Sequence, residues 1–239
     1  MLSETDLQDY YTFPNPEEAD LDGIVCAGGD LSPEMLISAY RQGIFPWFNE
    51  DDPTLWWSPD PRCVLIPGKA YVSKTMKRLF NQKKHTFRCD TNFYDVMANC
   101  KTIKRKSEDD TWISNDFIDA YCTLHHLGIA HSFEVYDEEN ILVGGLYGLS
   151  LGQIFYGESM FSHKSNMSKL AFILLSEFLK HKGFQLLDCQ VVNPHLMSLG
   201  AEEMSRDTFL KINNSCIKEK THLGNWTLEV ERFCKDLFI

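Results

Sequence analysis

The chain has 239 residues, of which 44% are hydrophobic and 24% are charged, and its formal net charge is −11. This apolar share is ample for a core, in one large domain or in a small and a medium one. No apolar run reaches the roughly 20 residues of a membrane span, and the acidic stretch MLSETDLQDYYTF lacks the pattern of a signal peptide. We therefore expect a cytoplasmic protein without a membrane helix.

The eight cysteines are scattered, with no CxxC pair and no histidine at metal-ligand spacing. They are expected to be reduced and mostly buried, and no metal site is predicted. The chain also lacks a GxSxG elbow, an HExxH motif, a Walker loop and a Rossmann GxGxxG motif. Ordinary nucleotide chemistry is therefore not indicated.

The first clear element is a helix within GGDLSPEMLISAYRQGIFPW. Ser32 is a plausible N-cap, a proline follows at the first helical position, and Gly43 ends the helix. Residues 45–67 contain five prolines and three of the five tryptophans, which predicts a rigid and irregular connector. We expect a small N-terminal domain over residues 1–62 and a larger domain over residues 63–239.

In the larger domain the hydrophobic period changes from helical to extended and back. The predicted elements are two short helices, a longer helix, a group of three strands, a buried helix, a strand and a helical turn. In that order they cover residues 73–80, 91–100, 114–128, 130–159, 168–183, 184–190 and 193–200. The order of elements is an α+β pattern.

Charge is unevenly distributed along this domain. Ten lysines and arginines lie between Lys74 and Lys106 against two aspartates, so that segment carries +8 and the remainder −19. The segment is either a solvated helix face or a stripe that binds phosphate groups. The residues alone leave both interpretations open.

Two polar clusters interrupt the core pattern. The first, within residues 156–169, holds Glu158 and four serines spaced three apart. The second is LLDCQ, where Asp188 and Gln190 share one face of a buried strand because side chains alternate along it. An N-capping turn and a polar pair that fixes strand register are the structural alternatives. The functional interpretation places Glu158, Asp188 and Gln190 around one cleft.

Eight segments in order resemble the leucyl/phenylalanyl-tRNA–protein transferases: GDLSPEMLISAYRQGIFPW, WWSPDPR, TWI, AHSFEV, VGGLYG, GESMFS, SK and DCQ…HLMSLGA. The match runs from about residue 13 to residue 209. It implies an enzyme that moves Leu or Phe from aminoacyl-tRNA to the α-amino group of proteins with N-terminal Lys or Arg, for N-end rule degradation. It also implies an acetyltransferase-like (GNAT-type) larger domain. We expect no cofactor, no membrane partner and a monomer.

The resemblance implies that Gln190 receives the proton of the amine with help from Asp188, and Glu158 is the third catalytic residue that we expect. An α-amino group has a pKa of about 7.7–8.0, so a useful fraction is neutral and positioning of the reactants can supply most of the catalysis. We hypothesise that Gln190 orients the amine and that Asp188 orients Gln190. The helix beginning near Asn166 is expected to present free N–H groups to the same cleft.

The resemblance also implies three binding sites for the aminoacyl-tRNA. Aromatic residues at Tyr40, Trp47 and Trp112 would hold the terminal adenosine by stacking. Basic residues at Lys83, Lys84, Lys104 and Arg105 would hold acceptor-stem phosphates. An apolar pocket for the Leu or Phe side chain would be lined by Leu146, Phe155, Met160, Phe172, Leu175 and Leu187. From the residues alone, these aromatic and apolar residues are equally well explained as interdomain or core packing.

Two alternatives stay beside this hypothesis. One is an acyl-CoA-dependent N-acyltransferase, which holds a pyrophosphate on a glycine-rich loop before the main helix. Here that place reads SHKSNMSK, without glycine. The other is a non-catalytic module that binds tRNA or basic N-termini; it would not need Asp188 and Gln190.

Overall fold

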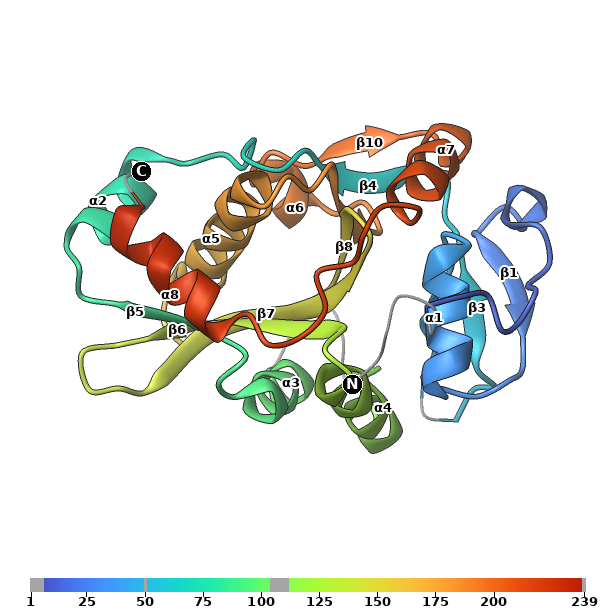
Figure 1. Cartoon of the computed structure of the whole chain (residues 1–239), viewed down its shortest axis with the longest axis horizontal. Coiled ribbons are helices and arrows are strands. Elements are labelled where there is room, and N and C mark those ends of the chain that lie inside the picture. Colours follow the sequence, from blue (N-terminus) through green and yellow to red (C-terminus); the bar gives the residue numbers. More distant parts are fainter. Residues whose placement is uncertain (1–6, 50, 104–111, 238–239) are drawn as a thin grey trace.

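The computed structural model describes residues 7–49, 51–103 and 112–237. A small sheet near the N-terminus has the strand order β1 (Ile24–Ala27), β3 (Leu55–Trp57), β2 (Phe45–Pro46). Helix α1 (Pro33–Arg41) lies beside these strands (Figure 1). A 3₁₀ turn at Pro16–Glu18 precedes them.

The rest of the chain is built on a seven-stranded sheet. Its neighbouring strands are antiparallel, except that β8 and β9 run parallel. In spatial order the strands are β10 (Glu202–Met204), β4 (Arg62–Leu65), β9 (Leu186–Gln190), β8 (Ile154–Ser162), β7 (Leu142–Leu151), β6 (Ala130–Tyr136) and β5 (Thr86–Cys89).

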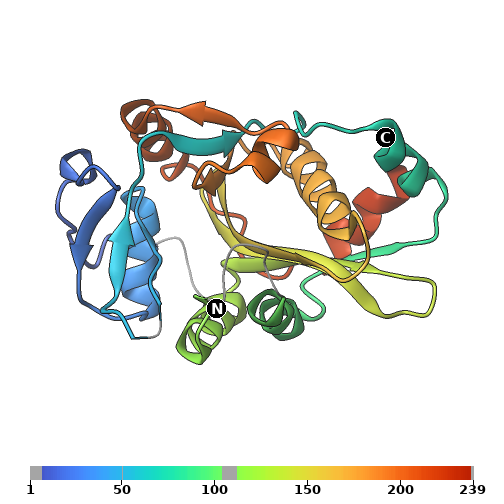
Figure 2. The same cartoon turned by 180° about the vertical axis from the view of Figure 1, so that it is seen from behind.

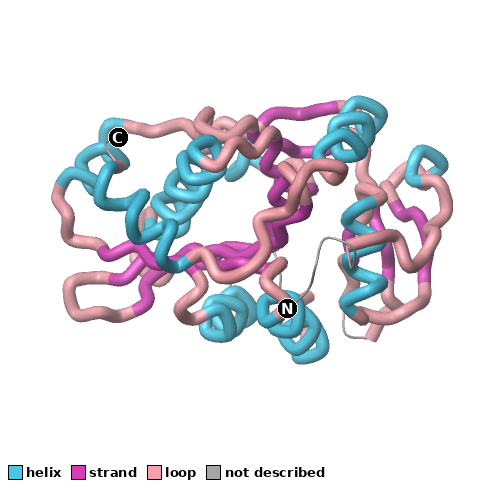
Figure 3. Tube along the Cα trace, in the orientation of Figure 1, coloured by secondary structure: helices cyan, strands magenta, loops and turns pink. Residues whose placement is uncertain are grey.

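Helices cover both faces of this sheet (Figures 1 and 2). The long α5 (Met167–His181) packs on one face with α2 (Lys74–Asn81) and α8 (Thr227–Asp236). On the other face lie α3 (Phe93–Thr102) and α4 (Asn115–His126). Near β4 and β10 lie α6 (Pro194–Ser198) and α7 (Arg206–Cys216), and a long loop from α7 crosses the sheet to α8 (Figure 3).

The predicted helices are confirmed, and side-chain capping marks where some of them begin. Ser73 and Ser114 accept hydrogen bonds from Met76 N and Phe117 N, which satisfies one free donor at each helix start. The predicted helix after Ser32 is α1. Ser32 lies at the N-cap position as predicted, but its side chain makes no capping hydrogen bond. The backbone turns left-handed at Gly43 (φ 76°) just beyond the helix.

The three strands predicted within residues 130–159 and the strand over 184–190 are also confirmed, as is the α+β class. The prediction of an irregular connector over residues 45–67 is wrong, because this segment contributes β2, β3 and β4. Each is only two to four residues long, too short to show a hydrophobic period between prolines. The division predicted after residue 62 falls at the beginning of β4 and stays a prediction.

No helix formed by the described residues has both the length and the apolar composition needed to cross a bilayer. All eight cysteines are free thiols, and five of them are buried. In the part of the chain that the structure describes, no group of three or more His, Cys, Asp or Glu side chains could hold a metal ion.

Candidate active site

The parallel pairing of β8 and β9 brings the three predicted catalytic residues together. Tyr156 lies opposite Asp188 in the register, so Glu158 comes level with Gln190 two residues further on. The Gln190 side-chain Nε2 donates a hydrogen bond to Glu158 Oε1 at 2.8 Å. The Gln190 backbone N donates to Asp188 Oδ1 at 2.9 Å.

Asp188 has a further partner that was not predicted. Its carboxylate is fully buried and accepts two hydrogen bonds from Arg62, at 2.8 Å from Nε and 2.7 Å from Nη2. Asp188 therefore acts on Gln190 through the backbone N of that residue, while Glu158 holds the side-chain amide. Buried ions need close pairing of this kind, and the bidentate geometry supplies it.

Arg62 was not predicted as a site residue. Its side chain has no exposed surface, and its guanidinium carbon lies 4.7 Å from the ring centre of Phe45 and 4.3 Å from that of Phe209. Nη1 also donates to the carbonyl oxygen of Gly43 at 3.3 Å. Arg62 thus ties the end of β9 to the segment after α1 and to α7.

Gln190 departs from the regular strand that the sequence predicts. Its φ is 64°, in the left-handed region, which costs a non-glycine residue about 1 kcal/mol. The pairing of β4 with β9 also shifts register at this point. The bond from Gln190 N to Asp188 helps to hold this conformation, which turns the amide toward Glu158.

Glu158 accepts hydrogen bonds from three different elements. Tyr40 of α1 donates to Oε1 at 2.6 Å, Tyr121 of α4 to Oε2 at 3.3 Å, and Gln190 to Oε1. Burial raises the pKa of Glu158 to about 7, and the charge of Asp188 acts in the same direction, while the three donors lower it. The carboxyl group can therefore exchange a proton near neutral pH.

The structure does not support Tyr40 as a stacking surface for adenosine. Its ring is fully buried, packs against Tyr156 with ring centres 5.0 Å apart, and directs its hydroxyl group to Glu158 and Tyr121. A ring without exposed surface cannot accept a base on its face. Tyr121 of α4, which was not predicted as a site residue, joins Tyr40 in the Glu158 cluster.

An apolar cavity of about 70 Å³ opens beside Glu158. Five of the six predicted pocket residues line it together with Glu158, namely Leu146, Met160, Phe172, Leu175 and Leu187. Phe155 is not part of this lining. It is fully buried and packs against Trp226, with ring centres 6.2 Å apart, so its assignment to the pocket is corrected.

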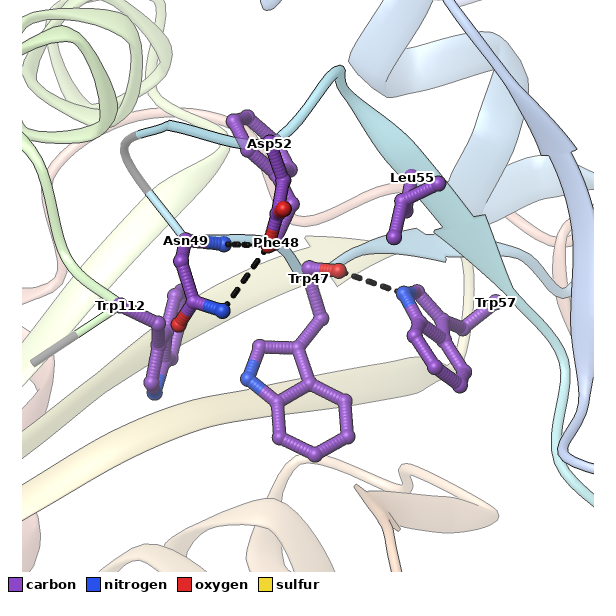
Figure 4. Close-up of a pocket in the computed structure, with 7 residues that line it drawn as sticks. All are labelled: Trp47, Phe48, Asn49, Asp52, Leu55, Trp57 and Trp112. Carbon is purple, nitrogen blue, oxygen red and sulfur yellow. Dashed lines mark hydrogen bonds between the residues drawn. The ribbon is translucent and has the colours of Figure 1, made fainter. Parts of the chain in front are cut away.

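A second hollow, of about 260 Å³, lies beside the small N-terminal sheet (Figure 4). Trp47 and Trp112 both line it, as do Phe48 and Trp57, although Trp112 is far from the others in sequence. The ring of Trp47 packs on that of Trp57 at 5.2 Å, and Trp57 Nε1 donates to Trp47 O. Two of the three predicted adenosine-binding residues are therefore neighbours.

The N-terminus of α5 is less open than predicted. Ser162 Oγ accepts hydrogen bonds from Met167 N at 3.1 Å and from Ser168 N at 3.2 Å. These two N–H groups are satisfied within the chain, so they are not free for a ligand.

Part of the predicted phosphate-binding stripe can be placed. Lys83 and Lys84 are exposed in the turn after α2. Helix α2 lies at the end of the molecule opposite the small sheet (Figure 1). Lys84 Nζ lies 3.5 Å from the carboxylate of Glu138. Lys104 and Arg105 lie outside the described residues.

Comparison with known proteins finds two family models. Residues 64–214 match the leucyl/phenylalanyl-tRNA protein transferase model, and residues 29–60 match the model of the N-terminal domain of the same proteins. A curated leucyl/phenylalanyl-tRNA–protein transferase of Flavobacterium johnsoniae is 53% identical over 203 residues, covering 85% of this chain and 95% of the relative. One of Desulfatibacillum aliphaticivorans is 47% identical over 225 residues, covering 94% and 96%.

Solved structures give weaker similarities. A GCN5-related N-acetyltransferase from Kribbella flavida aligns at 8% identity with a TM-score of 0.38, covering 72% of this chain and 61% of that one. The structure of L-PGS from Bacillus licheniformis aligns at 12% identity with a TM-score of 0.38, covering 63% and 48%. Scores at this level carry no argument about the chain.

Proposed function

The chain belongs to the leucyl/phenylalanyl-tRNA–protein transferase family, and from this premise we propose that it moves Leu or Phe from aminoacyl-tRNA to the α-amino group of proteins with N-terminal Lys or Arg. The proposed role is to mark those proteins for N-end rule degradation in the cytoplasm. The observation that carries the proposal is the hydrogen-bonded pair of Glu158 and Gln190 at the edge of an apolar cavity, which Glu158 itself lines.

The donor would occupy two of the sites described above. The aminoacyl side chain enters the apolar cavity, where Met160 can adapt its shape to a branched or an aromatic group. The terminal adenosine stacks between aromatic rings of the hollow that Trp47 and Trp112 line. The ester carbonyl then lies near Glu158, between the two sites.

The amine would be oriented by Gln190. Because Glu158 holds Nε2 of Gln190, the same hydrogen bond fixes the orientation of the amide and so the position of Oε1. Oε1 makes no hydrogen bond within the described residues. An amide oxygen accepts hydrogen bonds, so it can bind an N–H of the neutral acceptor amine and leave the nitrogen lone pair free. Asp188 fixes the backbone of Gln190 by accepting a hydrogen bond from its N, and Arg62 in turn holds the Asp188 carboxylate.

The reaction is aminolysis of an ester. The amine nitrogen forms a bond to the carbonyl carbon, the bond from that carbon to the tRNA 3′ oxygen breaks, and a proton passes from nitrogen to the departing oxygen. Glu158, with a pKa of about 7, is matched to an α-amino group of pKa about 7.8, so it can take this proton and return it to the 3′ oxygen.

Transfer of labelled Leu and Phe from charged tRNA to a peptide beginning with Arg tests the proposal. We expect peptide labelling with Arg or Lys at the first position and little with Glu. Acetyl-CoA serves as the control donor and should give no product. Labelling from acetyl-CoA instead of charged tRNA would replace the proposal with the acyl-CoA alternative.

Charge reversal at Lys83 and Lys84 tests the phosphate-binding stripe. The variant with both changed to Glu is expected to raise the donor KM several-fold. It should also lower the slope of log KM against the logarithm of salt concentration by about one for each lost phosphate contact. Its matched control is Lys218→Glu/Lys220→Glu, the same charge change at exposed residues after α7. Equal donor KM values for both variants would remove these two lysines from the tRNA site.

A further inference from the structure

The aromatic hollow beside the small sheet contains one polar pair that the stacking role does not use. Asn49 and Asp52 line it together with the tryptophans (Figure 4). Asn49 donates to Asp52 Oδ2 twice, at 2.9 Å from Nδ2 and at 3.3 Å from the backbone N. In Figure 4 the pair lies on one side of the Trp47 ring, with the side chain of Asn49 between Asp52 and Trp112.

This arrangement leaves one strong acceptor for a ligand. Both bonds from Asn49 end on Oδ2, and Oδ1 of Asp52 has no hydrogen bond to any described residue. A carboxylate oxygen accepts hydrogen bonds and does not donate them. Because Asn49 holds Asp52 through two bonds, the position of the free oxygen is set before a ligand arrives.

Stacking alone does not distinguish one purine from another, since every base has an aromatic face. A hydrogen-bond acceptor at the rim of the hollow does distinguish them. Adenine carries an amino group at position 6, which donates, whereas guanine and hypoxanthine carry a carbonyl oxygen there, which accepts. A carboxylate oxygen therefore attracts the amino group of adenine and repels the carbonyl oxygen of guanine or hypoxanthine.

We propose that Asp52, held by Asn49, reads the 6-amino group of the terminal adenine of the donor and so determines which base the hollow accepts. The inference rests on the proposed function and adds a specificity residue to it. Trp47 and Trp112 supply sequence-tolerant stacking, and Asp52 supplies the selection.

Small donors separate this role from binding of the tRNA body. Leucyl esters at the 3′ hydroxyl of adenosine, inosine and 2′-deoxyadenosine are compared by kcat/KM with an Arg-initiated peptide as acceptor. Wild type is expected to prefer the adenosine ester over the inosine ester by about tenfold, as one good base contact gives. It should use the 2′-deoxyadenosine ester nearly as well as the adenosine ester.

The variant Asp52→Asn should remove or reverse this preference. Its amide can still accept from Asn49 while offering an N–H group to the inosine carbonyl, so use of inosine should rise relative to adenosine by about tenfold. Asp51→Asn is the matched control, because Asp51 is an exposed neighbour outside the lining of the hollow, and it should keep the wild-type preference.

The other possible outcomes contradict either the reading of the base by Asp52 or the proposed function itself. Equal use of adenosine and inosine by wild type, or an equal loss on both donors in Asp52→Asn, would overturn base reading while transfer itself stands. Discrimination against the deoxy donor that disappears in Asp52→Asn would show that Asp52 reads the ribose instead. Absence of transfer from charged tRNA by wild type would overturn the proposed function.

Discussion

Replacing Arg62 with Met is expected to lower the free energy of unfolding by about 3–5 kcal/mol. Met retains an apolar stem between Phe45 and Phe209 but leaves the fully buried Asp188 carboxylate without its partner. The charge cannot reach water, so the folded state bears the full cost of desolvation. Urea unfolding of wild type and Arg62→Met at neutral pH measures the difference.

Three further variants, Asp188→Asn, Arg62→Met/Asp188→Asn and Lys211→Met, show whether the ion pair is the cause. Arg62→Met/Asp188→Asn removes both charges, so its loss of stability should be smaller than the sum of the two single losses by more than 1 kcal/mol. Lys211→Met, which breaks an exposed pair with Asp207, should leave the unfolding midpoint almost unchanged. Additive losses, or a loss from Arg62→Met no larger than that of the control, would contradict the assignment.

Replacing Glu158 with Gln is expected to reduce kcat/KM at pH 8 by about 100-fold, the scale of a lost general base. The amide keeps the size of the side chain and can still accept from Tyr40, but it cannot take a proton. In wild type, kcat/KM should rise as pH increases through about 7, the pKa of Glu158. The variant should lose that rise and retain only the ionisation of the acceptor amine near pH 7.8. An unchanged pH profile would exclude Glu158 as the proton acceptor.

The same variant should gain stability relative to wild type as pH rises from 5 to 8. The folded state raises the pKa of Glu158 from 4.5 to about 7, so between these values the folded chain binds a proton that the unfolded chain has released. Wild-type stability therefore falls as pH rises through this window, and the loss is complete above pH 7. Gln does not titrate, so the stability of Glu158→Gln relative to wild type should rise by about 2 kcal/mol between pH 5 and pH 8. Urea unfolding at these two pH values tests this, and a constant difference would contradict it.

Helices were the most predictable part of the fold. Their serine caps and following glycines act locally, within three or four residues, so the sequence carries the whole signal at Ser73, Ser114 and Gly128. The long strands β6 to β8 were predictable for a similar reason. Strands β1 to β5 and β10 were not, because a strand of two to four residues is defined by its partner rather than by its own period.

At the site, the residue types were predictable but their pairing was not. The motifs indicated Glu158, Asp188 and Gln190, and the parallel register brings them together. The left-handed backbone of Gln190 could not be predicted, and with it the side-chain amide bonds Glu158 while the backbone N bonds Asp188. Arg62 gave no signal of its own, since its two aromatic neighbours are 17 and 147 positions away along the chain. The burial of Tyr40 likewise depends on Tyr121 and Tyr156, which other elements supply.

The position of Arg62 between Phe45 and Phe209 has a consequence for synthesis. β4, β8 and β9 have all left the ribosome before α7, yet the aromatic sandwich around the guanidinium is incomplete until residue 209 has emerged. A nascent chain that stops short of α7 has Asp188 and Gln190, but it lacks Phe209, which packs on the Arg62 side chain that holds Asp188. The growing polypeptide is therefore expected to stay inactive toward the aminoacyl-tRNA that surrounds it during translation.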